Sequence, residues 1–191
     1  MSSNTQSRLT RRAFTFSAIT GVAVTAACGN GVGSQGAAKI DARVDATLNE
    51  MYTLYPNTRD LAAKSSGMLV MPLVTEAGLW FGGAYGRGAL RVNGVTVDYY
   101  STAKASAGLQ IGAAQYAHVL FFMTDEALSD FRYSSGWAAG GDLEYVITDQ
   151  GDSLAADTTT LTSPVLAAVF SQAGLRVGAT LEGTKYTRII P

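Results

Sequence analysis

Residues 67–112 read GMLVMPLVTEAGLWFGGAYGRGALRVNGVTVDYYSTAKASAGLQIG, and this stretch decides the fold. At its centre, Asn93 and Gly94 stand between Val92 and Val95. Asn-Gly supplies two residues that tolerate a positive φ, as the two-residue type I′ turn of a β-hairpin requires. We therefore expect two antiparallel strands that meet at this turn.

The strand before the turn carries glycine at alternating positions, namely Gly78, Gly82, Gly86 and Gly88. Glycine weakens a flat strand, so this pattern indicates sharp coiling or a close approach of a neighbouring backbone, as at the corner of a barrel. The fold class that we predict is α+β and mainly β. It is a small, strongly curved antiparallel β-barrel with a few short helices packed outside.

Composition bounds the class of protein. The chain has 191 residues, which allows one domain with a substantial core, and 47% hydrophobic against 15% charged residues excludes a disordered chain. The formal net charge is -1, but residues 1–27 hold three arginines and no acid. The rest of the chain is therefore acidic overall, which argues against a nucleic-acid partner because such proteins present a basic face.

The N-terminus resembles an export signal. Residues 10–16 (TRRAFTF) resemble the twin-arginine motif, and the apolar run that follows is too short to span a bilayer comfortably. It ends in VTAAC, which resembles a bacterial lipobox except that Thr25 stands where leucine is usual. We predict a signal peptide over residues 1–27 and lipidation of Cys28. The alternative is ordinary cleavage nearby, with Cys28 removed or left as a free thiol.

Two segments follow the predicted anchor. Residues 28–38 are rich in glycine, serine and alanine and predict a flexible tether, and residues 39–191 form the domain. The domain begins with a helical stripe of Ile40, Val44, Leu48 and Met51. Such a stripe can lie on a membrane or pack on the domain, and its mixed charge favours packing.

The remaining elements follow from shorter patterns. Residues 59–65 predict a second helix, which Pro56 separates from the first, and Thr124 caps a third that runs to Tyr133. Apolar or alternating runs predict strands over residues 106–113, 115–123, 143–148, 164–171 and 175–190. Residues 149–159 are expected to form a mobile loop, and residues 172–174 to turn the chain into its last strand.

Three segments resemble the signature blocks of the SYLF domain family and occur in the order found in that family. They are SSGMLVMPLVTEAGLWFGGAYGRGAL, YYSTAKASAGLQIGAAQYAHVLFF and GLRVGATLEGTKYTRI. The resemblance covers nearly the whole chain after residue 38. It implies a β-barrel core with helices outside, and binding of phosphoinositides or other anionic lipids; some eukaryotic members also bind actin filaments.

The residues that match the family blocks are mostly glycines with structural roles: Gly78, Gly82, Gly83, Gly108, Gly112, Gly174, Gly178 and Gly183. The family often has a lysine directly before the leading glycine of its first block. Here Ser66 occupies that position, and Lys64 lies two residues earlier.

No reaction class is supported by the sequence. His118 is the only histidine and lies in an apolar strand, so we expect a buried or barrel-lining group rather than a catalytic base. One histidine and one cysteine exclude a soft-ligand metal cluster, and we predict no cofactor. A carboxylate calcium site between Asp149 and Asp157 is conceivable.

We therefore predict a non-enzymatic lipoprotein of the bacterial cell envelope, lipid-anchored on the periplasmic or outer-membrane side, that binds anionic headgroups weakly. The candidate lipid-binding residues are Arg59, Lys64, Arg87, Lys104 and Arg132. The alternative for each is that it faces solvent or pairs with a nearby acid. A second hypothesis is a structural lipoprotein whose barrel binds an unknown protein partner, and a third is a hydrolase that uses His118.

Overall fold

The computed structural model describes residues 34–78, 81–107, 112–140, 143–147, 163–174 and 181–191. The described elements are α1 (Gly36–Leu54), α2 (Thr58–Lys64), β1 (Gly67–Gly78), β2 (Phe81–Val92), β3 (Val95–Ala107), β4 (Gly112–Phe122), α3 (Asp125–Tyr133), β5 (Trp137–Ala138), β6 (Glu144–Ile147), β7 (Val165–Gly174) and β8 (Lys185–Ile189).

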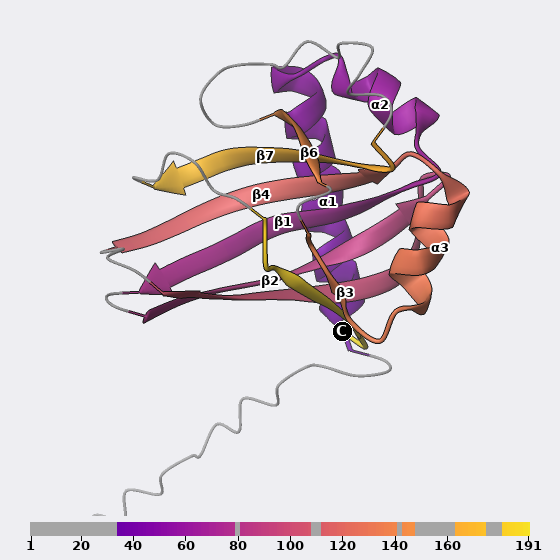
Figure 1. The fold of residues 1–191 in the computed structure, drawn as a ribbon. Helices are drawn as coiled ribbons and strands as arrows, with labels where there is room; N and C mark the ends of the chain where they lie inside the picture. Colours follow the sequence, from indigo (N-terminus) through magenta and orange to yellow (C-terminus); the bar gives the residue numbers. More distant parts are fainter. Residues whose placement is uncertain (1–33, 79–80, 108–111, 141–142, 148–162, 175–180) are drawn as a thin grey trace, which may run out of the picture.

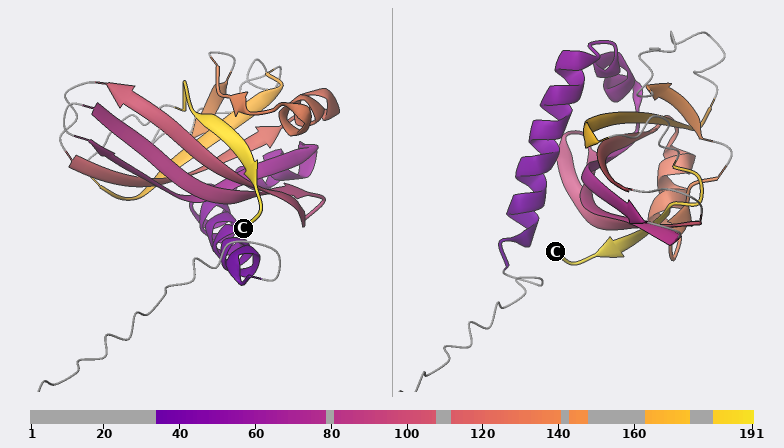
Figure 2. Two further views of the ribbon diagram at one scale, coloured as in Figure 1. Left: turned by 90° about the horizontal axis from the view of Figure 1, so that it is seen from below. Right: turned by 90° about the vertical axis from the view of Figure 1, so that its left-hand side faces the viewer.

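The strands form one curled sheet in the order β5-β8-β3-β2-β1-β4-β7-β6 (Figures 1 and 2). This confirms a mainly β fold built on a strongly curved sheet. The prediction that the sheet is purely antiparallel is wrong, because β6 pairs parallel with β7. A parallel pair needs a connection of about a dozen residues or more, and the segment between Ile147 and Val165 is long enough to return the chain to the same end. Because the end strands β5 and β6 do not pair with each other within the described residues, the curled sheet is a half-barrel instead of a closed barrel.

The hairpin at the centre of the sheet is confirmed. Val92 pairs with Val95, and Asn93 and Gly94 have φ values of 50° and 78°. Further along β2, Gly88 lies beneath the carbonyl oxygen of Val70, with which a Cβ at this position would overlap. The close backbone approach that the glycine pattern predicted is therefore present, at the place where β1 departs from regular pairing.

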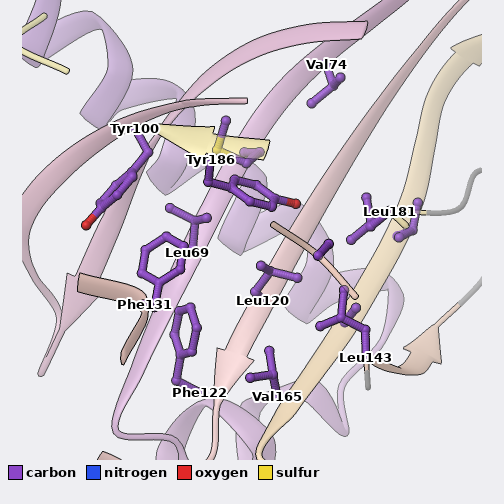
Figure 3. Packing of buried hydrophobic residues seen from close by; sticks show 14 of the residues in the cluster. Leu69, Val74, Tyr100, Leu120, Phe122, Phe131, Leu143, Val165, Leu181 and Tyr186 are labelled. Atoms are coloured by element: carbon purple, nitrogen blue, oxygen red, sulfur yellow. The ribbon is translucent and has the colours of Figure 1, made fainter. Parts of the chain in front are cut away.

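Side chains pack on both faces of the sheet. The inner cluster combines aliphatic side chains with a row of aromatic rings: those of Tyr100, Phe131 and Phe122 follow one another at centroid distances of 4.7 and 4.8 Å (Figure 3). Phe131 comes from α3, which thereby covers one end of the half-barrel. The outer cluster joins the convex face to α1 and α2, and α1 runs along the outside of the curled sheet (Figure 2). The buried residues Ile40, Val44 and Met51 of α1 belong to this cluster. The predicted stripe of α1 therefore packs on the domain.

Some predicted boundaries are wrong. Residues 106–113 do not form a strand of their own, because Ser106 and Ala107 end β3 and Gly112 begins β4. Residues 172–174 continue β7 instead of turning the chain. The last strand, β8, is limited to five residues, since Leu181 to Thr184 form a turn in which Gly183 has a φ of 74°.

No helix within the described residues combines the length and the apolar character needed to cross a bilayer.

Candidate functional site

A groove of about 570 Å³ lies on the convex face, between the N-terminal half of α1 and strands β1 and β2. We call it the basic groove, because its charged lining residues are Lys39, Arg43 and Arg87. The other lining residues are Gln35, Gly36, Ile40, Pro72, Leu73, Thr75, Tyr85 and Gly86.

The local sequence explains how α1 forms one wall. Ile40 and Val44 are buried against the sheet, so Lys39 and Arg43, each one residue earlier, lie along one side of the contact. Their spacing of four residues places both side chains on the same face of the helix, about one turn apart. Both residues are exposed.

Strands β1 and β2 form the other wall. The pairing of β1 with β2 shifts between Val70 and Val74, and Pro72 and Leu73 lie in this irregular segment. Proline lacks a backbone N–H and is found at such breaks in the ladder rather than in regular central pairing. Tyr85 and Arg87 face the same side of β2 and are exposed, Tyr85 by 57%.

The electrostatics of the basic groove are one-sided. Among the described residues that line it none is acidic, and Lys39 and Arg43 make no ion pair within the described chain. The two acids of α1 nearest to them are engaged elsewhere. Asp45 accepts a hydrogen bond of 2.7 Å from Arg91, and Asp41 accepts bonds from Thr96 and Tyr99. The groove therefore concentrates positive charge on a chain that is acidic overall.

Only one of the predicted lipid-binding residues, Arg87, lines this groove. Lys104 pairs in register with Ala84, an inner-face residue, and is half-buried. Arg87 pairs with Ser101, which lies three residues from Lys104 along β3. Residues an odd number of positions apart on a strand face opposite sides, so the side chains of Arg87 and Lys104 point to opposite faces of the sheet. Both residues make contacts with other parts of the chain.

The other three candidates lie away from the groove. Arg59 stacks its guanidinium 4.7 Å from the ring centre of Tyr52, and Lys64 ends α2; both follow the C-terminal end of α1. Arg132 forms an ion pair with Asp98, with Nε 3.2 Å from Oδ2. The five residues thus do not form one cluster. Sequence reasoning missed Lys39 and Arg43, although their spacing on a helix with a clear buried stripe could have indicated a shared face.

His118 lies inside the half-barrel and is completely buried. Its Nε2 atom is 2.9 Å from the hydroxyl of Tyr186, and its Nδ1 atom has no hydrogen-bond partner among the residues that the structure describes. Burial lowers the pKa of His118 to about 3 and raises the pKa of Tyr186 well above its usual value. The pair is therefore neutral near pH 7 and shut off from solvent. This is the buried, barrel-lining role that the sequence predicted.

Two predicted sites lie outside the described residues, namely Cys28 and the acidic segment from Asp149 to Asp157. Within the part of the chain that the structure describes, no group of three or more histidine, cysteine or acidic residues could hold a metal ion.

The fold and the groove define a small, curled β-sheet domain with a cationic surface groove. Residues 103–188 match the Ysc84 family, described as Las17-binding protein actin regulator, which confirms the resemblance to the SYLF domain. The matched segment begins within β3, so all the residues that line the basic groove precede it in the sequence. No curated protein matches the chain significantly.

Proposed function

We propose that this protein is a lipid-anchored envelope lipoprotein whose SYLF-type domain binds anionic lipid headgroups through the basic groove. The observation that supports this proposal is the convergence of Lys39, Arg43 and Arg87 on one groove, with no acid among its described lining residues. A Lys or Arg close to an anionic membrane surface contributes about 1 kcal/mol to binding. Phosphoinositides and other anionic lipids fall within the same headgroup chemistry.

The position of the groove in the chain fits the proposed anchor. Gln35 lines the groove and follows Cys28 by seven residues, a length of chain that reaches at most about 25 Å. In the proposed lipoprotein, the twin-arginine signal exports the chain, and a diacyl group on Cys28 holds the groove close to the bilayer. The high local concentration of headgroups then offsets the weak intrinsic affinity.

We further propose that the domain is not an enzyme. The support is the burial of His118, whose hydrogen-bonded partner Tyr186 is equally buried, so that no substrate in solvent can reach either ring. The description of the matched family also names binding of Las17 and regulation of actin, which keeps a protein partner as the second candidate function.

Co-sedimentation with liposomes tests the lipid proposal. In the full chain, Lys39→Gln with Arg43→Gln should weaken binding to phosphatidylglycerol vesicles about 30-fold, because two contributions of about 1 kcal/mol are lost. Lys64→Gln with Lys185→Gln is the matched control: both residues are exposed, neither lines the groove, and the net charge changes equally.

Binding of the chain that lacks both the lipid and the substitutions should also weaken with salt and vanish on neutral phosphatidylcholine, since screening acts over about 10 Å at 0.1 M salt. Equal losses in the two double variants would show a diffuse charge effect and contradict a role for the groove.

A further inference from the structure

A second groove, of about 400 Å³, lies where the half-barrel fails to close, between β5 and the start of β7. We call it the edge groove. It is lined by Thr124, Glu126, Ala127, Asp130, Trp137, Ala138, Gly140, Leu143, Pro164 and Val165. Leu143 and Val165 belong to the inner cluster (Figure 3), so the groove has an apolar floor that continues the core.

The backbone of β5 presents hydrogen-bonding groups at this edge. The N–H of Ala139 donates to the carbonyl of Thr184 at 2.9 Å, and the carbonyl of Ala139 accepts from Gly183 at 3.0 Å. Successive residues of an antiparallel strand direct these groups to opposite sides. The N–H and C=O of Ala138 therefore point away from β8. Among the described strands none pairs with β5 on that side.

The charge of the edge groove is opposite to that of the basic groove. Glu126 and Asp130 are exposed and lie four residues apart, on one face of α3. None of the described residues that line the groove is basic. Arg132, the one basic residue of α3, is paired with Asp98 and does not line it.

From these three features we infer that the edge groove binds an extended peptide segment of a partner protein in which lysine or arginine stands next to an apolar residue. The segment adds to the sheet at β5, and its backbone bonds to the N–H and C=O of Ala138. Its apolar side chain covers Leu143 and Val165, and its cationic side chain lies beside Glu126 and Asp130. An acidic peptide is excluded by the same carboxylates.

An NMR titration of the full chain with the end-blocked peptide Ac-Lys-Val-Lys-Val-Lys-NH2 tests the inference. Saturable shifts should appear at the Ala138 amide and the Trp137 indole. Glu126→Gln with Asp130→Asn should weaken binding about fivefold, since two exposed ion pairs contribute about 1 kcal/mol together. Asp60→Asn on α2, which changes an exposed acid outside the groove, should leave binding unchanged.

Ala138→Pro removes the N–H at the edge and should weaken the same peptide further, while an unchanged thermal midpoint shows that the variant is folded. Three results would overturn the inference: no saturable shift with the peptide, equal binding of Ac-Glu-Val-Glu-Val-Glu-NH2, or binding of n-butylammonium as tight as that of the peptide. The last result would mean that the carboxylates select a cation without strand addition.

Discussion

Replacing His118 by glutamine should flatten the acid side of the stability curve. The native state holds the imidazole neutral, because burial lowers its pKa from 6.5 to about 3. The unfolded chain takes up a proton below pH 6.5. Between pH 6.5 and pH 3 the unfolded chain therefore binds a proton that the native state does not bind. The free energy of unfolding is highest above pH 6.5 and decreases as the pH falls toward 3.

The magnitude follows from one proton. Each pH unit in this window costs about 1.4 kcal/mol of unfolding free energy, so His118 should account for about 2 kcal/mol between pH 6.5 and pH 5. Glutamine does not titrate and retains a polar group that can reach the hydroxyl of Tyr186, which lies 2.9 Å from Nε2.

Urea unfolding from about pH 7 down to about pH 5 measures this difference. Carboxylates titrate in both proteins, so their effect cancels when the two curves are subtracted. The variant should be less stable near neutral pH and lose stability with acid less steeply. Parallel curves for the two proteins would refute the reasoning, because they would mean that His118 is protonated in the native state as readily as in the unfolded chain.

Three further predictions concern the fold and the anchor. Gly88→Ala should cost about 1–3 kcal/mol of unfolding free energy, because its Cβ would meet the Val70 carbonyl, whereas Gly140→Ala should change stability little, since no atom of the described residues lies within 4 Å of its Cβ. Gly94→Val should cost on the order of 1–3 kcal/mol because valine is strained at a φ of 78°, and a loss below a few tenths in urea unfolding would contradict the turn. Cys28→Ser should abolish fatty-acid labelling and release the protein from membranes; unchanged labelling would exclude Cys28 as the lipid acceptor.

The local elements of the fold could be predicted from the sequence because their signals are local. The Asn93-Gly94 turn, the glycine at position 88 and the stripe of α1 each depend on residues that are close in the chain. The parallel pairing of β6 could not be predicted, since the apolar run around it is compatible with either direction. The short β8 was missed for a similar reason. The sequence around Gly183 is compatible with a strand, and only the structure shows that this glycine lies in a turn.

The candidate site was predicted less well than the fold. Arg87 was named from the sequence, but its neighbours in the basic groove, Lys39 and Arg43, come from a helix more than 40 residues away in the chain. Only the packing of α1 across β1 and β2 brings these charges together. The two grooves of opposite charge, on different parts of the half-barrel, likewise arise from packing and leave no trace in a net charge of -1.

Photo-crosslinking at the basic groove tests the central claim most directly. A benzophenone amino acid in place of Tyr85, an exposed residue within the groove, should form adducts with phosphatidylglycerol in vesicles. The same group in place of Tyr133, which is more exposed and does not line the groove, should not. Adducts at position 85 that disappear when Lys39 and Arg43 are neutralised are the predicted result. Equal adducts at both positions, or none at position 85, would contradict binding of lipid headgroups by this groove.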